Sequence, residues 1–185
     1  MTDEYTFEED LSYGQNSIEL ALLILRENYP VEFIRLDSGG EADKELSVDV
    51  LAKFTDRTEP WAFKARRPKH IKWGDITIEL RNGTGERGDW FRFKSGLVQR
   101  YVYFWRENKH IHRLVVLNAK KLCNDIPLNE FWGAYNEDIR GVGKIRFNKN
   151  KKHGKSTFTC IQLKNIIEKH QEIIDFLYPQ TILTF

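Results

Sequence analysis

Cysteines and long apolar runs are scarce in this sequence, and each scarcity excludes a class of protein. The two cysteines, Cys123 and Cys160, have no Cys or His partner at zinc-binding spacing, which argues against a disulfide scaffold and a zinc module. No apolar stretch reaches the roughly 18 residues of a membrane-spanning helix. The first residues, MTDEYTFEED, lack the basic and apolar regions of a signal peptide. We therefore expect a reduced, intracellular (cytoplasmic) protein that is not secreted and has no membrane partner.

Common catalytic motifs are also missing. The sequence contains neither the GxxxxGK[ST] phosphate loop nor the GxSxG nucleophile elbow. A formal GxGxxG occurs at Gly83, Gly85 and Gly88, but no βαβ pattern precedes it and no long helix is predicted after it, so we set a dinucleotide site aside. His110 and His112 can share one strand face, yet no third ligand is evident, which favours a surface or structural role.

Apolar and aromatic residues are plentiful enough for a packed core. The 185-residue chain is 41% hydrophobic and 13% aromatic, and it has no repeat or low-complexity linker. Length and composition predict one domain over residues 13–185, preceded by an acidic tail at 1–12.

Basic residues gather in two clusters, although the net charge is only +2. Acid-free basic clusters suit a polyanion, whereas the alternative is a solvated loop and a lysine-rich hairpin tip. The residues expected to contact nucleic acid are Arg66, Arg67, Lys69 and Lys72 in the first cluster, and Lys149, Lys151, Lys152 and Lys155 in the second. Lys64 also belongs to the first cluster.

Hydrophobic periodicity predicts helices and strands in alternation, as in an α/β or α+β protein. A helix is expected over 16–28, with Asn16 or Ser17 as its cap and Pro30 after its end. The other expected helices are 94–100, 125–139 and 164–177; the expected strands are 31–36, 46–54, 61–66, 75–81, 101–105 and 113–118, with a hairpin formed by 143–148 and 156–163.

Polar residues alternate with apolar ones in the strands 46–54, 61–66 and 75–81, which we take to be neighbours. Val48 and Val50 are expected on the apolar face, while Asp49, Lys64 and Glu79 gather on the polar face. Carboxylates suit Mg²⁺ or Mn²⁺, which can neutralise a phosphodiester and activate water. The lysine can orient that water or stabilise developing charge. The alternative is a solvated face with an incidental ion pair.

These motifs, in this order, resemble the PD-(D/E)XK nuclease superfamily of restriction enzymes and archaeal Holliday junction resolvases. GQNSIE opens a helix with Glu19, SVDVLAKF resembles the metal-binding strand and supplies Asp49, and WAFKA resembles the (D/E)-x-Lys strand and supplies Lys64. GDWF and KSGLVQRYVYFW resemble the turn, helix and apolar strand that follow, and Gln99 and Tyr103 are similar to a Gln-x-x-x-Tyr motif of some branches. The resemblance implies an α/β, restriction-endonuclease-like core, with a mixed central sheet flanked by helices.

The resemblance covers residues 14–118 and departs from the family at Ala62, where an acid is expected. Glu79 can supply the missing carboxylate from the next strand, which is the arrangement we prefer. Alternatively the motif is Glu79-x-Arg81, or the site has lost its metal and activity. The C-terminal hairpin and helix, 125–178, lie beyond this core in the same nuclease-like domain.

The resemblance implies a metal-dependent nuclease that hydrolyses phosphodiester bonds in DNA. Asp49 and Glu79 would bind Mg²⁺ or Mn²⁺, and Lys64 and Glu19 would be catalytic. A homodimer would follow if one active site cuts one strand. The alternative is a catalytically inactive nucleic-acid-binding or protein-interaction module on the same fold.

Overall fold

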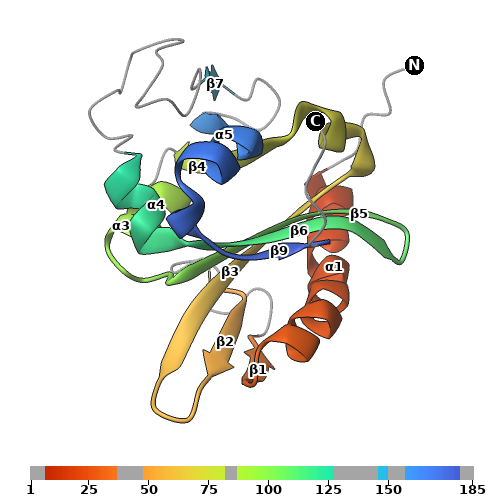
Figure 1. Cartoon of the computed structure of the whole chain (residues 1–185). Helices are drawn as coiled ribbons and strands as arrows, with labels where there is room; N and C mark the ends of the chain where they lie inside the picture. The colour runs from red at the N-terminus through yellow and green to blue at the C-terminus, as the bar shows by residue number, and fades with distance from the viewer. Residues whose placement is uncertain (1–6, 37–47, 82–86, 127–145, 150–156, 180–185) are drawn as a thin grey trace.

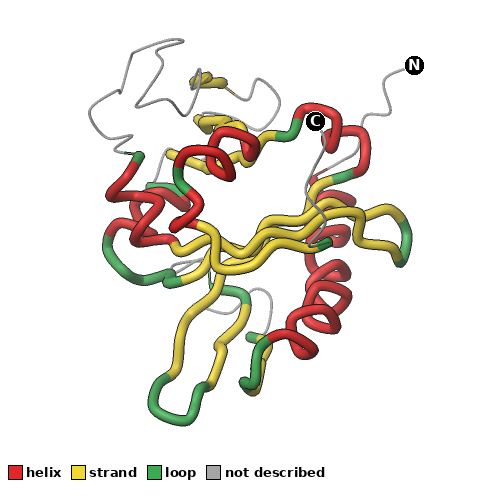
Figure 2. The backbone as a smooth tube through the Cα atoms, viewed as in Figure 1, coloured by secondary structure: helices red, strands yellow, loops and turns green. Residues whose placement is uncertain are grey.

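A mixed six-stranded sheet forms the centre of the protein, and helices flank it (Figures 1 and 2). The computed structural model describes residues 7–36, 48–81, 87–126, 146–149 and 157–179. Within these ranges a second sheet of three strands lies over one face of the larger sheet. The arrangement confirms the predicted α/β class with a mixed central sheet.

The larger sheet combines an antiparallel meander with one parallel pair. Its strands, in spatial order, are β1 (Glu32–Arg35), β2 (Val50–Lys53), β3 (Thr58–Arg66), β5 (Arg100–Glu107), β6 (His110–Asn118) and β9 (Ile174–Tyr178). β5 runs parallel to β3, whereas all other neighbours in this sheet are antiparallel. A parallel neighbour requires a crossover. Here the crossover contains the 3₁₀ helix η1 (Pro68–Trp73), strand β4 (Asp75–Arg81) and helix α3 (Asp89–Lys94).

Helix α1 (Phe7–Asn28) covers one face of this sheet (Figure 1). Its fully buried Leu22 and Leu25 pack in one cluster with Trp61 and Phe104 of the sheet, and burial of each leucine contributes roughly 1.5–3 kcal/mol. The helix begins nine residues before the predicted Asn16 cap, so the predicted acidic tail is helical from residue 7. Acidic residues are favoured in a first helical turn by the helix dipole, which explains the early start.

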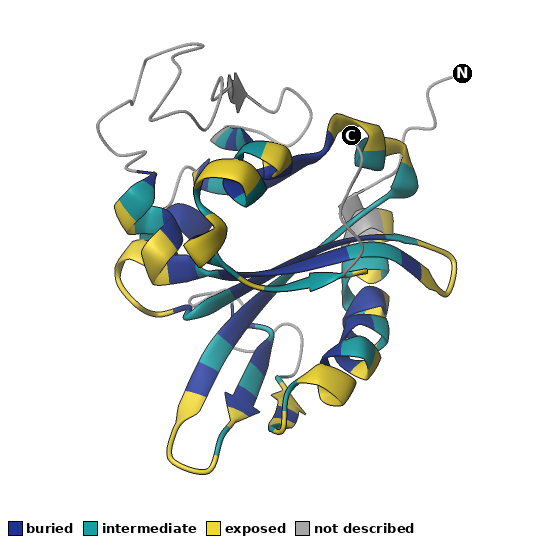
Figure 3. Ribbon diagram, viewed as in Figure 1, coloured by how far each residue is buried: buried dark blue, intermediate teal, exposed yellow. Residues whose placement is uncertain are grey.

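The opposite face carries the second sheet and the remaining helices. This sheet has the order β4–β8–β7, with β8 at Thr157–Gln162 and β7 at Arg146–Lys149. The helices are α3, α4 (Ala119–Asp125) and α5 (Leu163–Lys169). Buried side chains of β4, β8, α3, α4 and α5 join Tyr101, Tyr103 and Trp105 of β5 in one core, and Figure 3 shows the middle of both layers as buried.

Strand β4 is where the sequence-based prediction of the sheet was wrong. It was expected beside β3, but it pairs with β8 in the second sheet. Alternation predicted one polar and one apolar face for this strand, yet Asp75 and Thr77 are buried along with Ile76 and Ile78. The backbone pairing with β8, more than 70 residues further along the chain, places β4 in the second sheet.

The helical predictions in the second half of the chain also needed correction. The helix expected over 164–177 stops at Lys169; a 3₁₀ turn, η3 (Gln171–Ile173), and strand β9 follow. β9 is held by pairing with β6, a long-range contact that outweighs local helical periodicity. The helix expected over 94–100 is instead α3, which ends where Gly96 adopts a positive φ of 78°. The predicted hairpin of β7 and β8 is confirmed; of the helix expected over 125–139, residues 127–139 lie outside the described residues.

Among the helices of the described ranges, none has the length and apolar character needed to cross a membrane.

Candidate active site

Strands β3 and β4 face each other with polar side chains between them, although they belong to different sheets. Arg66 of β3 donates from Nη2 to the Thr77 hydroxyl of β4 at 3.3 Å. The positive charge of Lys64 on β3 opposes the rise that burial causes in the pKa of the Glu79 carboxyl on β4. The Tyr101 hydroxyl of β5 donates to the Thr77 carbonyl at 2.9 Å. Lys64 and Glu79 thus interact through their charges across the two sheets, with no ion pair between them among the described residues.

A second carboxylate, Asp89, meets Glu79 in this layer. Asp89 is the first residue of α3, is only 9% exposed, and accepts through Oδ2 from the backbone N–H of Glu79 at 3.4 Å. Gly88 makes this approach possible, because a Cβ at that position would lie 2.6 Å from the Glu79 carbonyl oxygen. Two acids from β4 and α3 are therefore close together and largely shielded from water.

The electrostatics of Glu79 reflect this shielding. Burial raises the pKa of the Glu79 carboxyl, and the neighbouring charge of Asp89 raises it further. Lys64 and Arg92 act in the opposite direction. An ionised carboxylate in this position is destabilised by its surroundings, which is the condition under which a bound cation is favourable.

The Asp49 carboxylate is hydrogen-bonded to the backbone of Phe63, the residue that precedes Lys64. Asp49 lies just before β2, its backbone N–H donates to the Trp61 carbonyl at 3.1 Å, and its Oδ2 accepts from the Phe63 N–H at 2.7 Å. Val48 and Val50 then point into opposite cores, so the common face predicted for them was wrong. The physical reason is that the Asp49 carboxylate takes a backbone donor of β3 and breaks the regular alternation at this point.

Glu19 is placed differently from the other predicted site residues. It is about half exposed on α1 and forms ion pairs with Arg35 at 3.5 Å and Arg26 at 3.9 Å. Among the described residues it makes no hydrogen bond or ion pair with the other three predicted catalytic and metal-binding residues. α1 also packs on the sheet face opposite to the one that carries Ala62.

The first basic cluster divides into inward-facing and outward-facing residues. Arg66 bonds to Thr77 in the polar layer, so it faces inward. Lys69 and Lys72 are exposed on η1. The Arg67 guanidinium lies 4.4 Å from the centre of the Tyr13 ring. Of the second cluster, Lys149 belongs to β7, while Lys151, Lys152 and Lys155 lie outside the described residues.

Trp73, which the sequence analysis did not single out, ends the same basic turn. Its side chain is 50% exposed, and its ring centre lies 4.7 Å from that of His70. Trp61, Trp90 and Trp105 are fully buried by contrast. An exposed indole between cations is typical of surfaces that stack on nucleic-acid bases.

The cysteine thiols do not suit nucleophilic chemistry. Cys123 and Cys160 are free. Burial raises the pKa of Cys123 to about 12 and that of Cys160 to about 11, so both are protonated at neutral pH.

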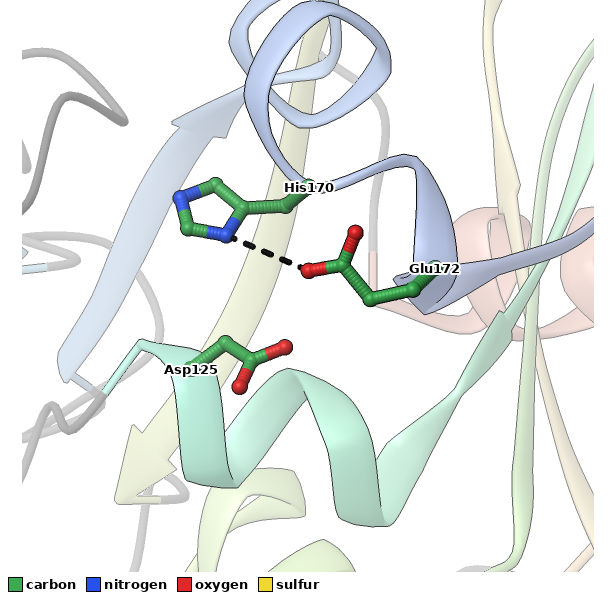
Figure 4. Close-up of side chains that lie close together, drawn as sticks. All are labelled: Asp125, His170 and Glu172. Carbon is green, nitrogen blue, oxygen red and sulfur yellow. Dashed lines mark ion pairs between the residues drawn. The ribbon is translucent and has the colours of Figure 1, made fainter.

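Another group of possible metal ligands lies away from β3. Asp125, His170 and Glu172 place one ligand atom each within 4.8 Å of one another, and they are the one such trio in the described part of the chain (Figure 4). The sequence analysis missed it because the residues come from separate elements, so no ligand spacing reveals them.

Comparisons with protein-family models, curated proteins and solved structures found no match for this chain. The function of the protein is therefore inferred from the geometry of the protein's own residues.

Proposed function

We propose that this protein is a metal-dependent nuclease that hydrolyses phosphodiester bonds in DNA. The observation that carries the proposal is the half-buried group formed by Lys64, Glu79 and Asp89. Carboxylates beside a lysine, close to a basic surface, match the needs of phosphodiester hydrolysis.

The order of elements supports the same proposal. A helix, α1, precedes an antiparallel strand pair, the middle strand β2 follows Asp49, and the next strand β3 carries Lys64. A further helix, α3, and the strand β5, which is parallel to β3, complete the order. This order resembles the one expected for a restriction-endonuclease-like core, with β4 inserted in the crossover.

The side chains present suit a divalent cation such as Mg²⁺ or Mn²⁺. Glu79 and Asp89 offer hard oxygen donors, and their mutual repulsion in a shielded site is relieved by positive charge. Asp49 would add a third carboxylate from the β2 side. The ion would neutralise the phosphate and lower the pKa of a bound water.

The protein's own residues perform the remaining tasks. The Phe63 N–H fixes the orientation of Asp49 through its Oδ2. The Lys64 ammonium, beside Glu79, can orient the attacking water and stabilise the negative charge that develops on the phosphate. Lys69, Lys72 and Trp73 on η1 would hold the nucleic acid.

The surroundings of Ala62 favour one of the two arrangements considered for the acid and lysine motif. It is 4% exposed and pairs with Tyr101 in an apolar layer, so a charged residue there would be costly. Glu79 approaches Lys64 from β4 instead, whereas Arg81 is exposed. Glu79 as the replacement acid is therefore favoured over a Glu79-x-Arg81 motif.

The proposal is tested by cleavage of plasmid and linear DNA with Mg²⁺ or Mn²⁺. Glu79→Gln and Lys64→Met should each slow cleavage by at least about 100-fold, because each removes charge from the reacting centre. Asp49→Asn should do the same while keeping an acceptor for the Phe63 N–H. DNA affinity measured without divalent ions should change little in all three variants.

A matched control is Glu32→Gln, which removes an exposed carboxylate on β1 that pairs with Lys53. It should cleave like the wild type. Metal-dependent cleavage that survives in Glu79→Gln and Lys64→Met would contradict the assignment.

The second candidate, an inactive binding or protein-interaction module, is favoured by the absence of an acid at Ala62. It predicts salt-sensitive binding of DNA that neither needs divalent ions nor leads to cleavage. A wild-type protein that binds DNA in this way and leaves it intact would select this candidate.

A further inference from the structure

Two helix ends converge at the Asp125, His170 and Glu172 trio (Figure 4). Asp125 is the last residue of α4, and His170 follows the last residue of α5. The C-terminal end of a helix carries partial negative charge, which disfavours a carboxylate and favours a cation. Glu172, on η3, adds a second carboxylate to the same place. The group therefore combines two helix C-termini and two carboxylates, four sources of negative potential, around one imidazole.

Hydrogen bonds to the backbone hold the segments that carry His170 and Glu172. The His170 backbone N–H donates to the Ile166 carbonyl at 2.9 Å, and the His170 side chain is only 14% exposed. Lys121 of α4 donates to the Glu172 backbone carbonyl at 3.1 Å, which anchors η3 to α4. In Figure 4 the His170 ring and both carboxylates point toward a common centre.

The distances suit a first-row transition metal. The Nδ1 atom of His170 lies 3.7 Å from the Glu172 Oε1. Two ligands of a tetrahedral zinc ion with bonds near 2.0–2.1 Å are roughly 3.4 Å apart. The Asp125 oxygen is within 4.8 Å of both, so a small side-chain movement closes the set. An imidazole with two carboxylates is a mixed nitrogen and oxygen set, which Zn²⁺ prefers more than Mg²⁺ or Ca²⁺ do.

We propose that Asp125, His170 and Glu172 bind a Zn²⁺-type divalent metal ion that links the end of α4 to the turn before β9. Three protein ligands leave a coordination position for water. Because β9 is at the edge of the larger sheet and pairs with β6 alone among the described strands, the ion would stabilise the path of the chain into this strand. This site is separate from the proposed nuclease centre, so either can fail without the other.

The test is isothermal titration of Zn²⁺ into the metal-free full chain. The wild type should bind one ion that Glu79→Gln also binds, and His170→Ala should weaken binding of this ion by at least about 100-fold, because even a mutation next to a ligand costs 10–100-fold. Glu172→Gln, at a half-exposed position that tolerates change, should also weaken binding and covers the case in which His170→Ala does not fold. Zn²⁺ should raise the melting temperature of the wild type but not of His170→Ala.

Two variants serve as controls. His110→Ala removes one histidine of the His110–His112 pair, whose ring centres are 4.7 Å apart, and Glu79→Gln alters the proposed nuclease site. Both should retain the ion. Zn²⁺ binding that is unchanged in His170→Ala and Glu172→Gln, or lost in His110→Ala, would overturn the proposal; so would a wild type that binds Zn²⁺ no more tightly than Ca²⁺. In these cases the contact between His170 and Glu172 alone accounts for the group.

Discussion

The backbone N–H of Glu79 donates to the carboxylate of Asp89 at 3.4 Å, which joins two acidic residues in the layer between the sheets. The pKa of Glu79 is raised by burial and then by the charge of Asp89, while Lys64 and Arg92 oppose the shift. The net direction shows that shielding outweighs the attraction of the nearby cations. Burial of an ionised carboxylate in this way lowers the stability of the folded protein. Ionisable groups with such raised pKa values are often found at functional sites.

The first prediction concerns stability and pH. The pKa of Glu79 is higher in the folded protein than in the unfolded chain, so the folded state binds this proton more tightly. Stability therefore falls as the pH rises through the window above the unfolded value of about 4.3. Glutamine carries no such penalty, so Glu79→Gln should melt at a higher temperature than the wild type at neutral pH. The difference should vanish below about pH 4.

Thermal melts followed by circular dichroism from acidic to neutral pH provide the measurement. Glu32→Gln, on exposed β1, should show no comparable pH-dependent difference. A Glu79→Gln variant that melts below the wild type at neutral pH would mean that the attraction of Lys64 is the larger effect.

The second prediction concerns the close approach of α3 to β4. In Gly88→Ala the new methyl group would meet the Glu79 carbonyl, because the Cβ position is 2.6 Å from that oxygen. The free energy of unfolding should fall by about 1–3 kcal/mol, as in other overpacked sites. Urea denaturation measures this change.

Gly14→Ala is the matched control, because nothing lies within 4 Å of a Cβ at that position in α1. It should be neutral or stabilising by up to about 1 kcal/mol. If Gly88→Ala were as stable as the wild type, α3 would be free to shift, and the geometry of Asp89 against Glu79 would not depend on glycine.

Strands of the larger sheet were predicted well where their partners are close in the sequence. In the hairpin of β2 and β3, apolar and polar residues alternate along the strands, and turn-forming residues join the two strands. β5 showed a continuous apolar run because both of its faces are covered: Tyr101 and Tyr103 point to one core and Val102 and Phe104 to the other. Local pattern and burial agree in these strands.

Elements with distant partners were predicted less well. β4 pairs with β8, so its membership of the second sheet depends on residues far along the chain. Ile174–Tyr178 fits a helical pattern in isolation, but β6 draws it into the larger sheet. Sequence periodicity does not show with which distant strand a segment will pair, or whether it will form a helix instead.

The candidate site shows the same division. Lys64 and Glu79 were proposed from residue type and strand position, and in the structure the charge of Lys64 opposes the raised pKa of Glu79. Asp89 was missed because GDWF predicts a turn, and its contact with Glu79 arises only when α3 packs on β4. An acid at the first position of a short helix, directly after a glycine, was the available signal.

The third prediction concerns Trp73 and depends on the proposed function. Its half-exposed indole on the basic turn should stack on an unpaired base, so Trp73→Ala should weaken single-stranded DNA binding by about 1–3 kcal/mol. Fluorescence anisotropy with a labelled oligonucleotide measures the affinity.

Leu97→Ala removes another exposed apolar side chain, 43% exposed, and is the control for a general loss of apolar surface. Its affinity should equal that of the wild type. Equal affinities for Trp73→Ala and the wild type would show that η1 contributes charge alone.

The fourth prediction separates backbone contacts from base contacts on the same turn. Lys69 and Lys72 are exposed on η1, where each can neutralise one phosphate. The slope of log affinity against log salt for duplex DNA should therefore become shallower by roughly 0.9 for each lysine replaced by alanine. Lys53→Ala, on β2 in an exposed ion pair with Glu32, should leave the slope unchanged. Because release of counterions does not depend on sequence, the loss should be equal on unrelated duplexes. An unchanged slope in the Lys69→Ala, Lys72→Ala double variant would place the DNA on another surface of the protein.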